Sequence, residues 1–342
     1  MIIRTLCLSI LLGVISSPLL AQTDQIVSHS KDITRGEIKK IGRDEVEIDE
    51  RGTVKKIPRS QIQTINFAGE PRELKAGRDA AQGDKYEEAL ENLAKVKADD
   101  LSREELKQEL AFFTAYSKAK LSLSGSDRAA SEKELFDFVK ANNDSFHFYE
   151  AAELLGELAF AGGSYEDAVK RYAALAKSSA PDVQMRGGYW EGKSLLAKGD
   201  VTNAMAKFEQ VISSPNNDPT SAGIKALCEI GKARCFIESG KAAEGIAIAQ
   251  GIVDRNDPKD RVLFGEAYNA LGLGRLKTDE KKAAVIAFLH VDLLFPSQPQ
   301  THAEALFHLE KLWTEQGKAD RAQECRNMLK EQYGGTVWAT KG

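Results

Sequence analysis

Residues 267–296 carry the hydrophobic pattern of two consecutive helices. Apolar residues share one helical face in each half, at spacings of three, four or seven positions: Tyr268, Leu271 and Gly272, then Ala284, Phe288 and Val291. Polar residues 277–280 separate the halves, and Pro296, which lacks a backbone N–H, ends the second. Gly272 and Ala284 are small enough to let two antiparallel helices approach closely. A single hairpin of this kind cannot bury its apolar face, so the pattern predicts a repeat.

A small residue at the start of each second helix shows that repeat. It recurs at Ala89, Ala168, Ala204, Gly245, Ala284 and Ala322, with spacings of 79, 36, 41, 39 and 38 positions. A large apolar residue follows four positions later at Leu93, Tyr172, Phe208 and Phe288, whereas Ala249 and Arg326 depart from the rule. The double spacing of 79 positions predicts one more unit, which we place at 111–140. We therefore expect about seven helix hairpins.

These units resemble the tetratricopeptide repeat, a helix–turn–helix motif with alternating small and large sites. Units 148–181, 184–216 and 264–296 carry the resemblance best, and the matching positions in the first are Leu155, Gly156, Ala159, Tyr165, Ala168, Tyr172 and Pro181. The resemblance implies a mainly α protein, a helical-repeat solenoid over 71–335. A non-repetitive helical bundle is the alternative. The spacings exceed the usual period of about 34 residues, so we expect an irregular superhelix.

Before the repeats, residues 32–70 have the alternation of short strands. Val46 and Ile48 alternate with acidic residues, and a glycine at the 50–52 turn fits a hairpin. We expect four or five strands in a small β-barrel-like domain that resembles Sm-like or SH3-like barrels, with 22–31 as a linker. Positive and negative charges balance here, which favours a solvated face over an RNA-binding patch.

The N-terminus has the three parts of a secretory signal peptide: a basic start, an apolar run to Leu20, and Ala21 before a cleavage point. We expect removal of 1–21 and export to the periplasm or cell envelope, with no membrane span left in the mature chain. An uncleaved anchor is the alternative. Residues 336–342 are expected to form a C-terminal tail.

Composition and motifs give no case for catalysis. The net charge of −4 does not favour nucleic-acid binding. The five histidines do not pair with each other or with cysteine at metal-ligand spacings, and no nucleotide-binding or nucleophile motif stands in its required context. We therefore expect no enzyme activity, no metal and no cofactor.

Three cysteines remain after signal removal. Cys228 and Cys235 are seven apart on one predicted helix, so their Cα atoms lie about 10 Å apart, too far for a disulfide. We expect Cys228, Cys235 and Cys325 to be buried, unpaired thiols.

The resemblance implies a binding surface, since the first helix of each tetratricopeptide unit lines the concave side. Carried onto this chain, it assigns partner binding to Arg186, Tyr189, Lys193, Arg234, Asn269, Phe307 and Lys311. These residues suit a protein or an extended, acidic peptide, so we expect a scaffold. A structural or assembly factor of the cell envelope is the alternative function. Because these positions are expected to be exposed, changing Arg186, Lys193 and Arg234 together to Ala should cost less than ~0.5 kcal/mol each and should abolish partner binding. The alternative is that they are ordinary solvated helix positions.

Overall fold

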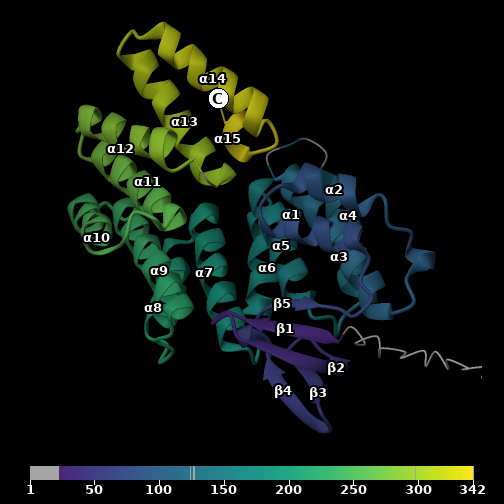
Figure 1. The fold of residues 1–342 in the computed structure, drawn as a ribbon. Coiled ribbons are helices and arrows are strands. Elements are labelled where there is room, and N and C mark those ends of the chain that lie inside the picture. Colours follow the sequence, from purple (N-terminus) through teal and green to yellow (C-terminus); the bar gives the residue numbers. More distant parts are fainter. Residues whose placement is uncertain (1–22, 124, 126–127, 297, 342) are drawn as a thin grey trace, which may run out of the picture.

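The computed structural model describes residues 23–123, 125, 128–296 and 298–341. Within them, five strands are followed by fifteen α-helices (Figure 1). The predicted signal peptide at 1–21 lies outside the described residues. Among the helices of the described residues, none is long and apolar enough to cross a membrane.

The strands form one antiparallel sheet. Their bounds are β1 (Asp24–Ser28), β2 (Ile33–Ile41), β3 (Glu45–Glu50), β4 (Thr53–Pro58) and β5 (Ile62–Asn66), and their order is β4-β3-β2-β1-β5. The predicted alternation is confirmed, because Val46 and Ile48 are fully buried. The predicted linker is wrong, since β1 lies within 22–31 and pairs with both β2 and β5.

The sheet does not close into the expected barrel. Closure would require β4 to pair with β5, but these strands are the two edges of the sheet. A physical reason is that Ile62 and Ile65 of β5 are buried in one core with helical residues such as Leu74. The helices therefore cover the apolar face that a barrel would otherwise have to enclose.

The described residues contain the seven expected hairpins. They are α1 (Arg72–Gln82) with α2 (Tyr86–Leu93), α3 (Glu104–Ser122) with α4 (Arg128–Ala141), α5 (Phe148–Ala161) with α6 (Tyr165–Leu175), α7 (Pro181–Lys198) with α8 (Val201–Ile212), α9 (Pro219–Glu238) with α10 (Ala242–Arg255), α11 (Arg261–Lys277) with α12 (Lys281–Leu294), and α13 (Pro299–Glu315) with α14 (Ala319–Tyr333). The predicted unit at 111–140 corresponds to α3 and α4. Pro181, expected to close a unit, begins α7 instead, a position where its missing N–H has no partner to lose.

Contacts between a glycine of the first helix and an aromatic ring of the second helix recur in these hairpins. A Cβ on Gly272 of α11 would lie 2.5 Å from Phe288 Cζ of α12, and one on Gly156 of α5 would lie 2.5 Å from Tyr172 Cζ of α6. These distances are too short for a side chain, so the glycine admits the ring of the partner helix. The large site of each of these hairpins thus packs against a glycine of the first helix.

The superhelix curves until its last unit meets its early units. Arg128 at the start of α4 donates a hydrogen bond to the carbonyl oxygen of Gly335. A Cβ on Gly163, in the α5–α6 turn, would lie 3.5 Å from a methyl group of Val337. The expected tail at 336–342 is therefore wrong, because it contains a short helix, α15 (Val337–Thr340), that packs on α13 and α14 (Figure 1) and brings Val337 close to the α5–α6 turn.

The predicted environment of the cysteines is confirmed. Cys228, Cys235 and Cys325 are all buried, and the first two lie on α9. Burial raises the pKa of the Cys235 thiol to about 12, so it stays protonated and packs as a small apolar group.

Candidate functional site

The inner side of the superhelix carries a cavity of about 480 Å³, here called the central cavity. Most of its lining comes from α7, α9, α11 and α13, the first helices of four hairpins, and from α15, the short helix at the C-terminus. Its volume is within the range of about 300–1,000 Å³ that is usual for ligand sites. The expected concave surface therefore exists as a hollow.

Five of the seven residues predicted for partner binding line the central cavity. They are Tyr189, Lys193, Arg234, Phe307 and Lys311. The other two do not join them. Asn269 has no exposed surface and donates hydrogen bonds to Thr301 O at 2.8 Å and Glu304 Oε2 at 3.1 Å, so its assignment to a ligand-facing surface is wrong. Arg186 lines a neighbouring cavity between the sheet and the helices.

Side chains from four successive first helices form a continuous polar network along the cavity. This inner belt consists of Lys193, Arg234, Glu266, Asn269, Thr301 and Glu304. Glu266 Oε1 accepts from Lys193 Nζ and from Thr301 Oγ1 at 2.8 Å. Glu304 accepts from both terminal nitrogens of Arg234, in a two-pronged ion pair. The belt therefore ties α7, α9, α11 and α13 together.

The electrostatics of the belt follow from these contacts. Burial acts to raise the pKa of Glu266, but the nearby Lys193 and Arg234 charges outweigh it and lower that pKa. Burial likewise acts against the charge of Arg234, yet Glu304 and Glu266 raise its pKa. Both groups are therefore charged at neutral pH and already have partners. The premise that Arg186, Lys193 and Arg234 are solvated positions is wrong, since all three are part-buried and ion-paired.

The C-terminal end of the cavity is lined by aromatic rings and two lysines. The rings of Phe307 and Trp338 lie 5.4 Å apart between centroids. Lys311 Nζ lies 4.3 Å from the Phe307 centroid, and Lys341 Nζ lies 4.1 Å from the Trp338 centroid. Burial lowers the pKa of the adjacent His308 to about 4, so its ring is neutral at pH 7. We call Phe307, His308, Lys311, Trp338 and Lys341 the C-terminal wall.

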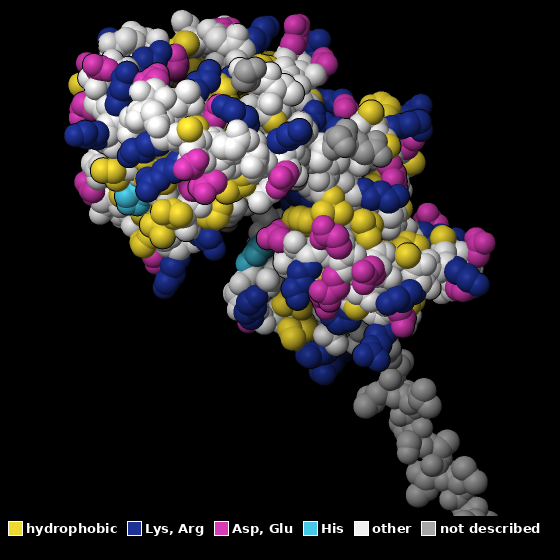
Figure 2. All heavy atoms as spheres, turned by 90° about the horizontal axis from the view of Figure 1, so that it is seen from above, with side chains coloured by type: hydrophobic (Ala, Val, Ile, Leu, Met, Phe, Trp, Pro, Cys, Tyr) yellow, Lys and Arg dark blue, Asp and Glu magenta, His cyan; other side chains and the backbone are white. Residues whose placement is uncertain are grey.

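Sequence reasoning missed three of the five wall residues: His308, Trp338 and Lys341. Trp338 and Lys341 were assigned to a tail because no repeat spacing reaches them. The signal that could have found Trp338 is a tryptophan beyond the last repeat, since a large aromatic residue is rarely left fully solvated. The space-filling view from above shows hydrophobic side chains beside Lys and Arg side chains on the face of the molecule that it draws (Figure 2).

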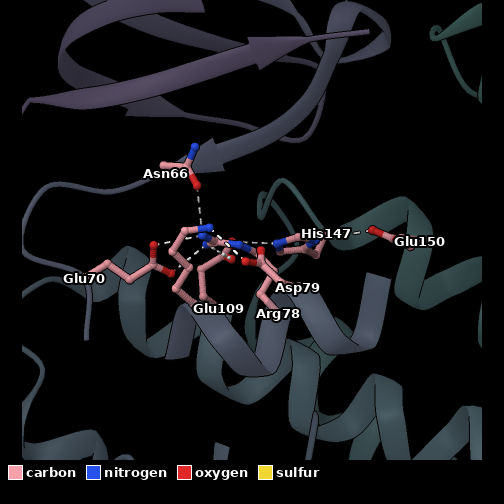
Figure 3. Close-up of polar contacts among 8 residues, drawn as sticks. Asn66, Glu70, Arg78, Asp79, Glu109, His147 and Glu150 are labelled. Atoms are coloured by element: carbon pink, nitrogen blue, oxygen red, sulfur yellow. Dashed lines mark hydrogen bonds and ion pairs between the residues drawn. The ribbon is translucent and has the colours of Figure 1, made fainter. Parts of the chain in front are cut away.

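The neighbouring cavity, of about 720 Å³, is lined by residues of the sheet and of α1, α3, α5 and α7. At one side of it lies a buried charge cluster, which consists of Glu70, Arg78, Glu109, His147 and Glu150 (Figure 3). Arg78 Nη1 lies 2.7 Å from Glu70 Oε1 and 3.2 Å from Glu109 Oε2. His147 Nε2 lies 2.7 Å from Glu109 Oε1. The cluster joins α1, α3 and the start of α5.

His147 is protonated at neutral pH within this cluster. Burial acts to lower its pKa, but Glu109 and Glu150 outweigh burial and raise it to about 9. The imidazolium ring stacks on Phe112, with the ring centroids 3.9 Å apart. Burial acts to raise the pKa of Glu109, and the His147 and Arg78 charges lower it. The cluster is thus a set of mutually paired ions rather than an acid–base pair poised near pH 7.

The site chemistry of the described residues offers binding groups and no metal centre. No set of three or more His, Cys, Asp or Glu side chains in that part of the chain could hold a metal ion. What the central cavity offers is apolar ring surface, a polar belt whose charged groups are paired, and two lysines at one end.

Comparisons with known proteins identify the fold. No family model matches the sequence, and no curated protein matches it either. Among solved structures, a tetratricopeptide repeat protein from Parabacteroides merdae ATCC 43184 is similar with a TM-score of 0.52 and 14% identity, over 76% of this chain and 91% of that one. Rap protein complexed with Competence and Sporulation Factor is similar with a TM-score of 0.53 and 13% identity, over 78% of this chain and 76% of that one. The chain therefore has a tetratricopeptide-type helical-repeat fold.

Proposed function

We propose that this protein is an exported, non-enzymatic scaffold that binds a partner protein or an extended peptide in its central cavity. The observation that carries the proposal is the convergence on one hollow of five residues from three of the first helices, α7, α9 and α13: Tyr189, Lys193, Arg234, Phe307 and Lys311. The geometry of the repeat alone predicts these five positions.

Two further observations support a binding role. The inner belt fixes the relative positions of α7, α9, α11 and α13, so the cavity is preorganised and little ordering accompanies binding. A protein of similar fold, Rap, has been solved with Competence and Sporulation Factor bound, so a fold of this type can hold a partner.

Site-specific photo-crosslinking tests the location of binding. A benzoylphenylalanine at Ala197, an exposed residue that lines the cavity, is compared with one at Thr202, an exposed residue of α8 outside it. We expect a crosslinked product of defined mass from Ala197 in the native host and none from Thr202. Equal yields at the two positions would contradict binding on the concave side.

Export is tested separately from binding. The proposal rests on the basic start, apolar run and small-residue cleavage point of residues 1–21. We expect the intact mass of the protein from its native host to correspond to a chain that begins at Gln22, within a residue or two. Retention of Met1 in a membrane fraction would replace export by membrane anchoring.

A further inference from the structure

The cations that line the central cavity fall into two groups. Lys193 and Arg234 form ion pairs with Glu266 and Glu304 of the inner belt. Lys311 and Lys341 have no carboxylate within 4 Å among the described residues, and each instead lies over an aromatic ring. The positive charge that remains available to a ligand is therefore at the C-terminal wall.

The acidic side chains of the cavity do not cancel this charge. The lining contains four Lys or Arg residues and three Glu residues. Glu266 and Glu304 are held by the belt, and the third, Glu238, lies 3.3 Å from Lys277. Because the carboxylates are held by other cations, an incoming anion meets Lys311 and Lys341 with little repulsion from them.

Apolar surface continues from the two lysines into the cavity. Phe307 and Trp338 form the wall itself, and Phe160 and Tyr165 of the third hairpin also line the hollow. A ligand that combined only charges would leave these rings against water. A ligand that places an aromatic ring among these side chains buries that ring and gains ring–ring contacts. Its adjacent carboxylates would then reach the two lysines.

From these observations we propose that the cavity recognises a partner segment in which a large aromatic side chain is flanked by acidic side chains. The aromatic side chain enters between the C-terminal wall and the third hairpin, and the carboxylates pair with Lys311 and Lys341. This inference rests on the proposed scaffold function and specifies the chemistry of the partner. It narrows the expectation drawn from sequence, in which an acidic peptide was assigned to all seven predicted positions, Arg186 and Arg234 among them.

The test uses the full purified chain and a peptide of defined sequence, acetyl-Ala-Glu-Phe-Glu-Ala-amide, with 4-fluorophenylalanine as its aromatic residue. Binding is followed by the broadening of the ¹⁹F signal during titration. The amide end removes a terminal carboxylate, so the side chains alone supply negative charge. The comparison peptide carries Lys in place of both Glu residues.

We expect the acidic peptide to bind at least tenfold more tightly than the basic peptide, and to weaken as salt is raised. The variant Lys311→Gln/Lys341→Gln should lose at least tenfold in affinity for the acidic peptide. The control Lys282→Gln/Lys330→Gln removes the same charge at exposed positions outside the cavity and should bind as the unmodified protein does.

Three results would overturn the inference: equal binding of the basic peptide, unchanged binding by the Lys311→Gln/Lys341→Gln variant, or no binding of the acidic peptide. The crosslinking experiment separates this failure from failure of the proposed function. A product at Ala197 without acidic-peptide selectivity leaves the scaffold in place with a different partner chemistry. Absence of both removes the scaffold proposal as well.

Discussion

Ionic groups have opposite surroundings in two regions of the molecule. One region is the charge cluster beside the sheet, and the other is the C-terminal wall of the central cavity. In the cluster, Arg78 is 2% exposed and lies between two carboxylates. In the wall, Lys341 is exposed and has a ring, not a carboxylate, as its neighbour. A buried, paired charge is needed by the fold because its loss leaves partners unsatisfied. A lysine without an acidic partner contributes little to the fold and remains available for binding.

The inner belt stands between these extremes. Its carboxylates are almost fully buried, whereas the side chains of Lys193 and Arg234 keep 16% and 19% of their surface exposed. We therefore expect the effects of removing charge to decrease from the cluster to the belt and then to the wall. Each prediction below tests one part of that order.

The largest effect is expected for Arg78→Ala, which leaves Glu70 and Glu109 facing each other without their shared cation. Removing one partner of a buried ion pair costs about 3–5 kcal/mol of unfolding free energy. Urea unfolding measures it, with Lys75→Ala as the matched control on the same helix. Lys75 forms an exposed pair with Asp79, so the control should lose less than about 1 kcal/mol.

Where Arg78→Ala does not yield folded protein, Arg78→Lys keeps the charge and should be intermediate in stability. A loss for Arg78→Ala as small as that of Lys75→Ala would show that the cluster is not needed by the fold.

The second prediction concerns the pH dependence of the cluster. The pKa of His147 is about 9 in the folded protein and about 6.5 when unfolded, so the folded state binds more protons between these values. Its stabilisation is fully present below about pH 6.5 and is lost as pH rises through 9. The expected change is on the order of a few kcal/mol, since each pKa unit corresponds to about 1.36 kcal/mol.

Chemical denaturation at pH 6 and pH 10 measures how the free energy of unfolding changes with pH. The His147→Gln variant should lack the contribution of His147 to that change. Arg78, Glu109 and Glu150 face the ring and remain charged across this range, so they should not mask the change. Equal slopes for the two proteins would contradict a protonated His147.

In the inner belt, Arg234→Ala should cost about 2 kcal/mol, because Glu304 would lose both of its bonds to the guanidinium but keep its bond from Asn269. The smaller value follows from the partial exposure of Arg234, which lets water replace some of the lost contact. Thermal unfolding followed by circular dichroism measures it. A stability loss equal to that of Arg78→Ala would show that the fold needs the belt charges as much as it needs those of the cluster.

The smallest effect on stability is expected at the wall. Lys311→Gln and Lys341→Gln each remove a cation–π contact, worth about 0.5–1 kcal/mol at exposed sites. The double variant should therefore stay folded, with an unfolding free energy within about 2 kcal/mol of the unmodified protein. A larger loss would mean that these lysines serve the fold.

The sequence by itself determined the helical repeat, since small and large residues recur at fixed spacings along the chain. Gly272 and Phe288 were recognised as parts of that pattern, and in the structure they pack against each other. The strands around Val46 were readable for the same reason, because alternation is a local property. The site was predictable only as a helix face, which included Lys311 but also the fully buried Asn269.

Only the tertiary structure decided which charges are paired, whether the sheet closes and what the C-terminus does. Arg234 meets Glu304 across 70 positions of sequence, and Arg78 meets Glu109 across 31. The contact between Arg128 and Gly335 depends on the curvature accumulated over all the units between them. Spacing along a helix determines which residues share a face, but the partner of that face depends on how successive hairpins rotate against each other.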